Sequence, residues 1–368
     1  MYARKTAQGK WRFAEAYPDP LTGKKREVSV TLDRNTNASR KEAASILQQK
    51  IKEATHTPPE SMRLHELIDK FIRYQYQMRK ESTAKQDEIM LAGVEKFLGS
   101  DALVSRITTP IIRERLDATH KDATWKNVKI KHIKTLFRWA YRQGYIPDTS
   151  VVDRLERYPE LSSRQKVLGK YLESDQLREV ISSMDTNTDY QLLTRFLVLS
   201  GCRVGEALAL TVKDVDIDTH EFRVDKTYAL NVRKVQSTKT EMSERTIHMR
   251  PELFDLVKIV LHRQKQICLA FGVRTDLLFP WYDGGHMHYE AYSKYFRDHV
   301  AKVIGHPLPV HSLRHTYTSL MAEAGVPIET ISRQLGHADS GITREIYMHV
   351  TDKMRKADNE KLDSVKIL

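Results

Sequence analysis

The first fifty residues alternate polar and apolar positions in the way that half-buried strands do. The alternation covers residues 11–17, where aromatic side chains are two apart, and residues 28–32, with a Pro- and Gly-containing turn between the two runs. Apolar residues at helical spacing then predict a helix over 40–54, with Asn37 or Ser39 as its N-cap. This segment is therefore predicted to be a hairpin followed by a helix.

A second segment is helical throughout. Residues 55–61 contain Pro58-Pro59 and predict a linker, because consecutive prolines stop a helix and stiffen a connection. From Leu64 to Leu155 apolar residues recur at helical spacing, and the longest predicted helix covers 124–142.

The helix over 124–142 is predicted to have an apolar stripe and a basic remainder. The stripe consists of Trp125, Val128, His132, Leu136, Trp139 and Ala140, and the basic residues on other faces are Lys126, Lys129, Lys131, Lys134 and Arg138. A helix with one apolar and one basic side suits a DNA backbone. An ordinary bundle helix with solvated lysines explains the pattern equally well.

A third segment follows a second predicted linker at 158–169. It begins near Glu173 and contains an apolar helix around 192–199, strand-like runs at 222–224 and 245–249, and further helices. The pattern as a whole predicts a mainly α chain with small β elements, an α+β fold. The domains expected are 1–55, 62–157 and 170–368.

Charge and composition narrow the class of protein. The 368 residues include 60 Lys and Arg against 48 Asp and Glu, for a net charge of +12, and residues 1–52 alone carry 12 basic and 5 acidic side chains. Such a concentration favours nucleic acid as a partner, although a solvated basic surface would have the same composition. No apolar run approaches a membrane span, and two cysteines without a C-x-x-C pattern fit a reducing cytoplasm.

Several standard motifs are absent from the sequence. It contains no phosphate-binding G-x-x-x-x-G-K-[ST], no dinucleotide-binding G-x-G-x-x-G and no G-x-S-x-G around a nucleophilic serine. His286 and His288 are two potential metal ligands, but no Cys or carboxylate cluster lies close to them in sequence. We therefore expect neither a cofactor nor a metal.

Cationic and imidazole groups of the C-terminal half are the remaining candidates for chemistry. Arg203 follows a glycine-containing turn with Glu206 three residues on, and His311 and Arg314 share one helix face. The other candidates are Lys239 on a predicted hairpin, His337 after a short helix, and Tyr347. Taken singly, each has a structural interpretation: an ion pair, a solvated turn, a helix cap or a core residue.

Taken together and in this order, the motifs resemble those of the tyrosine site-specific recombinases, within them the phage and conjugative-transposon integrases. The matching segments are Gly201-Cys202-Arg203-Val204-Gly205-Glu206, Ser237-Thr238-Lys239-Thr240, His311-Ser312-Leu313-Arg314-His315-Thr316, Leu335-Gly336-His337 and Tyr347-Met348-His349. The resemblance implies an arm-site DNA-binding domain over 1–55 made of a three-stranded sheet and a helix. It also implies a helical core-binding domain over 62–157 and a mixed α/β catalytic domain over 170–368.

The candidate residues have distinct expected roles. Arg203 and Arg314 match phosphate oxygens with planar forks, and His337 adds a hydrogen bond to the same oxygens. Tyr347 is the expected nucleophile, with His311 as its base. The resemblance implies Lys239 as the general acid, a 3′-phosphotyrosyl intermediate and strand exchange through a Holliday junction. The tyrosyl ester conserves the phosphodiester's energy, so the expected reaction needs neither ATP nor metal.

The resemblance also implies the partners. These are double-stranded DNA with core and arm-type sites, a homotetramer on DNA, and excisionase and host DNA-bending proteins as accessory factors, in the nucleoid of a bacterial host. The expected product is an integrated or excised phage genome or other mobile element.

Other functions remain open from the sequence. A type IB topoisomerase-like enzyme would share the phosphotyrosine chemistry, a DNA-binding regulator would use the fold without cleaving, and a metal-dependent nuclease would need a divalent ion. The C-terminal tail adds a hypothesis of its own. Thr351-Asp352 is expected to cap a helix over 353–361, and the apolar Val365, Ile367 and Leu368 would then dock on a neighbouring protomer or on their own domain.

Overall fold

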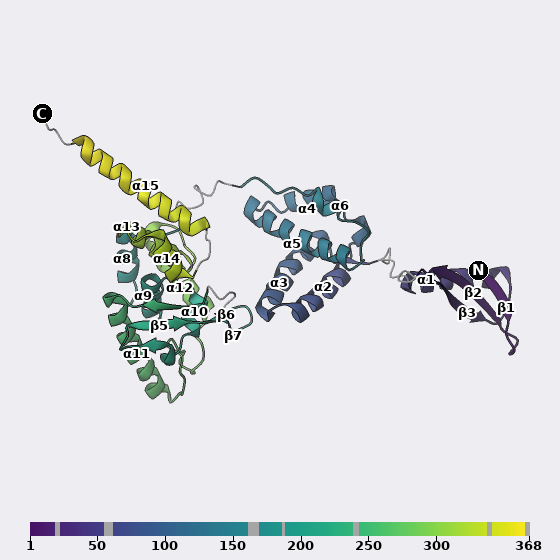
Figure 1. Ribbon diagram of the computed structural model, residues 1–368, viewed down its shortest axis with the longest axis horizontal. Helices are drawn as coiled ribbons and strands as arrows, with labels where there is room; N and C mark the ends of the chain where they lie inside the picture. Colours follow the sequence, from purple (N-terminus) through teal and green to yellow (C-terminus); the bar gives the residue numbers. More distant parts are fainter. Residues whose placement is uncertain are drawn as a thin grey trace. The chain divides into compact units, whose positions relative to one another are not determined.

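The computed structural model describes residues 1–18, 23–54, 62–160, 169–185, 188–237, 243–336 and 341–364. It divides into two compact units, Met1–Glu160 and Leu161–Leu368, each treated by itself below (Figure 1). Both predicted linkers fall largely outside these residues: 55–61 entirely, and 161–168 of the second. In the part of the chain that the structure describes, no helix is long and apolar enough to cross a membrane.

The N-terminal segment is a three-stranded antiparallel sheet, β1 (Tyr2–Lys5), β2 (Trp11–Pro18) and β3 (Lys25–Leu32), followed by α1 (Asn37–Ala54). The hairpin prediction is confirmed for β2 and β3, and β1 adds the third strand that the resemblance implied. Neither predicted residue caps α1. The helix begins three residues earlier, where the Thr36 hydroxyl accepts a hydrogen bond from the Ser39 amide at 3.2 Å.

The rest of the first unit is helical, as predicted. It consists of α2 (Leu64–Met78), α3 (Glu81–Leu98), a 3-10 turn (Val104–Arg106), α4 (Thr109–Asp117), α5 (Ala123–Arg142) and α6 (Ser150–Asp153). Its core is separate from that of the N-terminal sheet, and Phe71, Leu91 and Leu136 are among its fully buried residues. The ring of Trp139 packs at the centre, 5.1 Å from that of Phe71.

The predicted stripe on α5 is partly wrong. Val128 is 38% exposed, whereas Lys129 is only 6% exposed. The buried face is centred on Ile130, Ile133 and Phe137, which turns Val128 outward and Lys129 inward. The Lys129 ammonium is satisfied by the carbonyl of Met90 at 2.9 Å, and burial lowers its pKa. One lysine of the predicted basic side is therefore a structural contact to α3.

Tyr158 belongs to the helical unit and not to the linker. Its amide donates to the side chain of Asn127 at 2.8 Å, and its hydroxyl donates to Asp117 at 2.7 Å. The guanidinium of Arg113 lies 4.6 Å from the centre of its ring. These contacts fix the point at which the chain leaves the first unit, so the second linker begins later than predicted.

The second unit carries the candidate residues. Its elements in order are α8 (Ser174–Ser182), α9 (Asp189–Ser200), α10 (Val204–Ala209), a 3-10 turn (Val212–Asp214), β4 (Val215–Asp216), β5 (Glu221–Val224), β6 (Lys226–Ala229), β7 (Lys234–Ser237), β8 (Arg245–His248), α11 (Pro251–Phe271), α12 (Tyr289–Ile304), α13 (Ser312–Glu323), α14 (Ile328–Leu335) and α15 (Gly341–Ser364). Strands β4, β5 and β8 form one antiparallel sheet, and β6 pairs with β7 in a hairpin. The predicted helix around 192–199 and both strand-like runs are confirmed.

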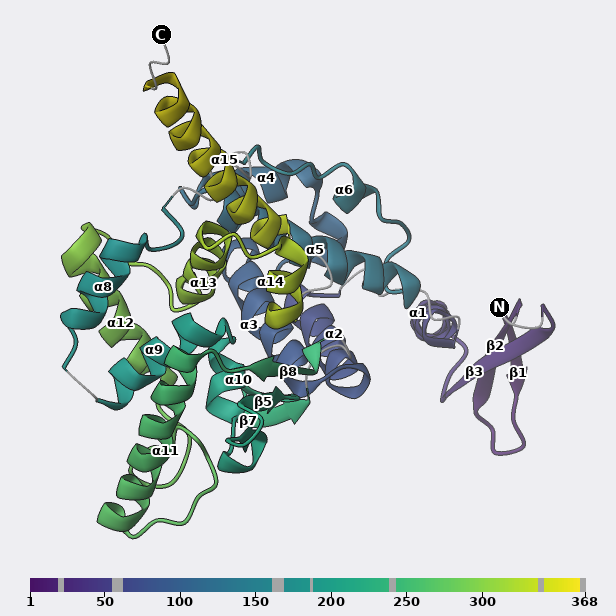
Figure 2. The same cartoon turned by 60° about the vertical axis from the view of Figure 1, so that its left-hand side comes forward.

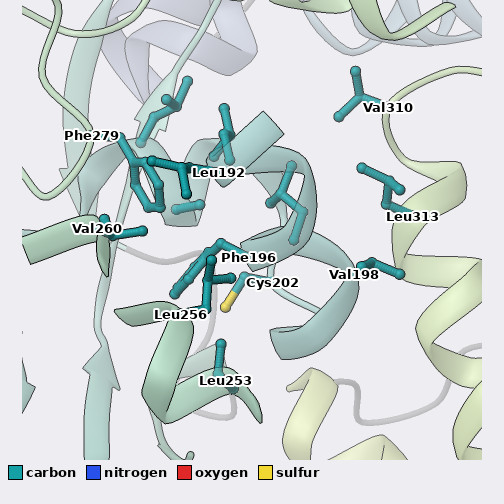
Figure 3. Close-up of a cluster of buried hydrophobic side chains, with 14 of the residues drawn as sticks. Leu192, Phe196, Val198, Cys202, Leu253, Leu256, Val260, Phe279, Val310 and Leu313 are labelled. Atoms are coloured by element: carbon teal, nitrogen blue, oxygen red, sulfur yellow. The ribbon is translucent and has the colours of Figure 1, made fainter. Parts of the chain in front are cut away.

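A continuous apolar core lies around α9, which is buried on most of its faces. The ring of Phe196 packs 5.1 Å from that of Phe279 and 5.5 Å from that of Phe222. In Figure 3, Cys202 lies beside Phe196, Leu253 and Leu256. Burial of this core holds α9 and the turn that follows it in place, and the first candidate arginine is on that turn.

The C-terminal helix is longer than the sequence predicted. Instead of a new helix capped by Thr351-Asp352, α15 runs from Gly341 to Ser364 without a break, alongside α13 and α14 near its start (Figure 2). The Thr351 hydroxyl donates to the carbonyl of Tyr347 at 2.9 Å, one turn back in the same helix, so it does not cap a new one. The tail residues Val365, Ile367 and Leu368 lie outside the described residues.

Candidate active site

Arg203 is presented by a tight turn between two helices. Gly201 ends α9 in the left-handed conformation, with φ of +68°, and α10 begins at Val204. The Arg203 side chain is 37% exposed, and its Nη1 donates to Glu206 Oε1 at 2.7 Å. Glu206, three residues on in the sequence, therefore orients this guanidinium.

Glu206 is shared between two arginines. Its side chain is 3% exposed, and its Oε2 accepts a hydrogen bond from Arg245 Nη2 at 2.8 Å. Burial by itself would raise the pKa of Glu206, but the hydrogen bond and charge of Arg245, with the charge of Arg203, lower it to about 2. The carboxylate is therefore ionised throughout the neutral pH range.

Arg314 is almost fully buried, at 2% exposure, on the first turn of α13. Its Nη1 donates to the carbonyl of Gly201 at 2.7 Å, and its Nη2 donates to the carbonyl of Leu335 at 2.5 Å. Burial, followed by the positive charge of Arg203, lowers the pKa of Arg314 to about 9. An anion bound beside Arg203 and Arg314 would therefore stabilise their charged forms.

His311 lies at the N-cap of α13, one helical turn before Arg314. Desolvation and the positive charges of Arg314 and Arg203 lower its pKa. The ring of His315 lies 4.9 Å from that of His311, nearly perpendicular to it. His311 is thus a neutral imidazole near pH 7 in the free protein, as a base must be before it accepts a proton.

Tyr347 is a half-buried residue of α15, which packs on α13. Its ring contacts two apolar clusters, one with Ile346 and Val350 of its own helix and the other with Ile331 and Leu335 of α14. The carbonyl of Leu335 is the one that accepts from Arg314. The predicted nucleophile therefore packs against a cluster that includes Leu335, the residue whose carbonyl accepts from the buried arginine.

The structure thus brings together Arg203, His311 and Arg314 and sets Tyr347 on a packed neighbouring helix. Lys239 and His337 lie outside the described residues. Their flanking elements are described: β7 ends at Ser237, and α14 ends at Leu335, with Gly336 left-handed at φ of +65°.

Arg245 was missed by the sequence analysis. It lies at the start of β8, with its side chain 6% exposed, and besides Glu206 it contacts Cys202 Sγ at 3.8 Å. A signal was present, because strand alternation puts Arg245 on the same face as the buried Ile247. Cys202 is a buried packing residue, and burial raises the pKa of its thiol to about 11, so the reactive thiolate is disfavoured.

The surroundings of His286 are those of a stacked aromatic side chain. Its ring stacks on that of Tyr228 at 3.9 Å, with only 9° between the planes. Among the described residues, no three His, Cys, Asp or Glu side chains lie close enough together to hold a metal ion.

Gly201 gives a prediction about the stability of this turn. A Cβ at this position would lie 2.7 Å from Tyr317 Cδ1 and 2.8 Å from Leu335 Cδ2, in addition to the left-handed backbone. We expect Gly201→Ala to reduce the free energy of unfolding by about 3 kcal/mol. Gly272 is a matched control, since it ends α11 with φ of +65° and has nothing within 4 Å.

In Gly272→Ala only the backbone strain remains, so we expect a loss of about 1 kcal/mol. Urea unfolding of both variants, followed by far-UV circular dichroism, measures the difference. Equal losses in the two variants would contradict the proposed close packing at Gly201.

Comparison with known proteins gives a consistent result. The model of the phage integrase family matches residues 170–354. A probable integrase of prophage ps2 from Lactococcus lactis is 25% identical over 97% of this chain and 98% of its own length. The integrase of Staphylococcus phage L54a is 23% identical over 87% of this chain and 99% of its own.

Solved structures show the same fold. The Tn1549 transposon integrase in complex with transposon right-end DNA has a TM-score of 0.62 at 19% identity, covering 82% of this chain and 100% of that one. A lambda integrase from a tetramer bound to a Holliday junction has a TM-score of 0.58 at 18% identity, covering 94% of each chain. The family match spans the residues that build the site described above. The chain therefore belongs to the phage integrase family and is a tyrosine recombinase of the integrase type.

Proposed function

We propose that this protein is an integrase that cleaves and rejoins double-stranded DNA at specific sites through a 3′-phosphotyrosyl intermediate. The observation that carries the proposal is the pairing of a buried and a partly exposed arginine around the turn at Gly201. Arg314 is held there by two carbonyls, and its lowered pKa marks a site where an anion is favoured. A phosphodiester is the anion that two guanidinium forks fit.

The reaction develops negative charge on the phosphate oxygens as the fifth bond to phosphorus forms. Arg203 and Arg314 stabilise that charge, and His337 adds a hydrogen bond to it. Because both arginines are held before DNA binds, little reorganisation is needed at the moment of reaction.

The covalent step exchanges one phosphate ester for another. The Tyr347 oxygen attacks phosphorus and its proton passes to His311, while the bond from phosphorus to the 5′ oxygen breaks and that oxygen takes a proton from Lys239. A 5′-hydroxyl from the partner duplex reverses the same steps and releases Tyr347. No nucleotide is hydrolysed, so rejoining uses the energy of the phosphotyrosyl bond.

We assign three domains to the chain: an arm-site DNA-binding domain at 1–55, a core-binding domain at 62–157 and a catalytic domain at 170–368. Each of these segments has its own main apolar core among the described residues, which supports the division. On the N-terminal sheet, Phe13 faces α1, whereas Arg12 pairs across the strands with Arg4 and lies on the opposite face. That basic face is the surface that we assign to the arm-site DNA.

Relatives of the same fold support a proposal for the assembly and the location of this protein. A lambda integrase forms a tetramer on a Holliday junction, and we propose a homotetramer on DNA for this chain as well. Phage and transposon relatives support integration and excision of a mobile element in a bacterial host. The two free cysteines, Cys202 and Cys268, are consistent with a cytoplasmic, nucleoid-associated protein. Excisionase and host DNA-bending proteins are further proposed partners.

The test is to map the covalent bond. The wild-type protein is incubated in EDTA with a nicked suicide substrate carrying the candidate attachment site, and the trapped adduct is digested and sequenced by mass spectrometry. We expect an adduct on the peptide that contains Tyr347, formed at the same rate with and without EDTA. Cleavage that needs a divalent metal and leaves no adduct would favour a nuclease. Adducts of equal yield on unrelated DNA would favour a topoisomerase-like enzyme.

A further inference from the structure

Arg245 connects the elements that surround the active site, although it is not among the six residues assigned to the chemistry. Its Nη2 donates to Glu206 Oε2 at 2.8 Å, and its Nε donates to the carbonyl of Gln334 at 2.6 Å. Its Nη1 donates to the carbonyl of Ser243 at 3.2 Å. With a side chain only 6% exposed, Arg245 holds these acceptors from within the fold.

Each acceptor either binds a residue assigned to the chemistry or lies close to one in sequence. Glu206 binds Arg203, Gln334 precedes His337 by three residues, and Ser243 follows Lys239 by four. One guanidinium on β8 is therefore in contact with the carboxylate that orients the first arginine, with the end of α14, and with the carbonyl of Ser243.

The contact between Arg245 and Glu206 determines which carboxylate oxygen is left for the Arg203 side chain. A guanidinium and a carboxylate prefer a bidentate pair, with both oxygens engaged. Here the two oxygens are divided: Oε1 accepts from the Arg203 side chain, and Oε2 accepts from Arg245 and from the Arg203 backbone amide. The Arg203 side chain keeps 37% of its surface exposed. Without Arg245, Oε2 would keep only the Arg203 backbone amide of these two donors, and it would lose the guanidinium that draws it away from the Arg203 side chain.

The contact with Gln334 holds the end of α14. The last two carbonyls of this helix accept from two different arginines, Gln334 from Arg245 and Leu335 from Arg314. Strand β8 and helix α13 therefore both hold the point at which the chain turns toward His337. Loss of one of the two contacts would let this point move relative to Arg314.

We propose that Arg245 is a positioning residue for DNA cleavage, which keeps Glu206 from closing onto Arg203 and holds the end of α14 beside Arg314. It acts through these groups and does not contact the phosphate. The inference rests on the proposed recombinase function, because the phosphate is the ligand for which Arg203 is kept available.

The test measures single-turnover cleavage of the suicide substrate at saturating DNA, corrected for the folded fraction from thermal melting. Arg245→Met preserves length and removes the charge. We expect its cleavage rate to fall by about 10- to 100-fold, because misplaced groups reduce transition-state stabilisation. The dissociation constant for intact DNA should stay within about 3-fold, because recognition is spread over many other contacts.

A second substitution separates positioning from simple structural damage. In Arg245→Met with Glu206→Gln, no carboxylate competes with the phosphate for Arg203. We expect this double variant to cleave at least about 5-fold faster than Arg245→Met alone, a coupling that independent lesions do not produce. A double variant that is slower than Arg245→Met would overturn the inference.

Arg245→Lys keeps a positive charge at the buried position. It provides a second test in case Arg245→Met misfolds. One ammonium does not reproduce the fork that reaches Glu206 and Gln334 together, so we expect its cleavage rate to fall by about 3- to 10-fold. Arg263→Met is the matched control. It breaks another arginine–carboxylate pair, with Asp189 at 2.8 Å, at the far end of α9, and its cleavage rate should match that of the wild type.

Cleavage by Arg245→Met and Arg245→Lys within 2-fold of the wild type, with Tyr347 adduct formation intact, would overturn the positioning role alone. A wild-type protein that forms no Tyr347 adduct on its cognate site would overturn the proposed function, and this inference with it.

Discussion

Tyr347→Phe is expected to abolish the covalent protein–DNA adduct, lowering strand cleavage by more than about 1000-fold. The substitution removes only the hydroxyl, which is the proposed nucleophile. The ring itself packs against the clusters around Ile346 and Leu335, and those contacts remain in phenylalanine. Folding and site-specific DNA binding should therefore be preserved.

Tyr171 is the matched control for this experiment. It is buried in one of the two clusters that contact Tyr347, and it also has a hydroxyl that phenylalanine would lack. Tyr171→Phe is expected to keep forming the adduct at a rate within about 3-fold of the wild type. Denaturing gel electrophoresis detects the adduct, and a mobility-shift assay measures binding. An adduct formed by Tyr347→Phe would rule out this tyrosine as the nucleophile.

Arg314→Lys is expected to lower the cleavage rate by about 100-fold while DNA binding is retained. The guanidinium donates to the carbonyls of Gly201 and Leu335 through two different nitrogens, and it must also meet a phosphate oxygen. A lysine ammonium is a single point with three donors and does not reproduce the planar fork. The charge is kept, so the change isolates geometry from net charge.

Arg263→Lys is the control for that substitution. Arg263 makes a two-point contact with Asp189, with Nε at 2.8 Å and Nη2 at 3.2 Å, so it too loses a fork on replacement. Asp189 and Gly201 lie at opposite ends of α9, roughly 18 Å apart along the helix. We expect Arg263→Lys to alter the melting temperature and leave the cleavage rate of the folded protein unchanged. A rate for Arg314→Lys equal to that of Arg263→Lys would contradict a direct role for Arg314.

Helical and strand periodicity predicted most of the fold. The α9 helix, the β5 and β8 strands and the helical segment from Leu64 onward follow the spacing of their apolar residues closely. The predictions are wrong where a polar side chain is buried or hydrogen-bonded in a way that its residue type does not indicate. Lys129 is buried because a main-chain carbonyl of α3 satisfies it, and hydropathy alone does not reveal such a partner.

Thr351 illustrates the same limit at the C-terminus. The sequence Thr351-Asp352 is typical of a helix start and predicts one. Instead, the hydroxyl bonds back to the carbonyl of Tyr347 within a continuous helix. The residue types are compatible with a helix start and with a helix interior. Packing of α15 on α13 selects the continuous helix.

By itself, the sequence determined the order of the candidate catalytic residues and the basic character of the first segment, and it predicted a division into three segments. These properties depend on residue type and spacing, which are local. The tertiary structure alone decided which groups meet: that Glu206 is shared by Arg203 and Arg245, and that Arg314 lies between the carbonyls of Gly201 and Leu335. The partners of such a contact are separated by up to 113 residues, and only burial of the common core brings them together.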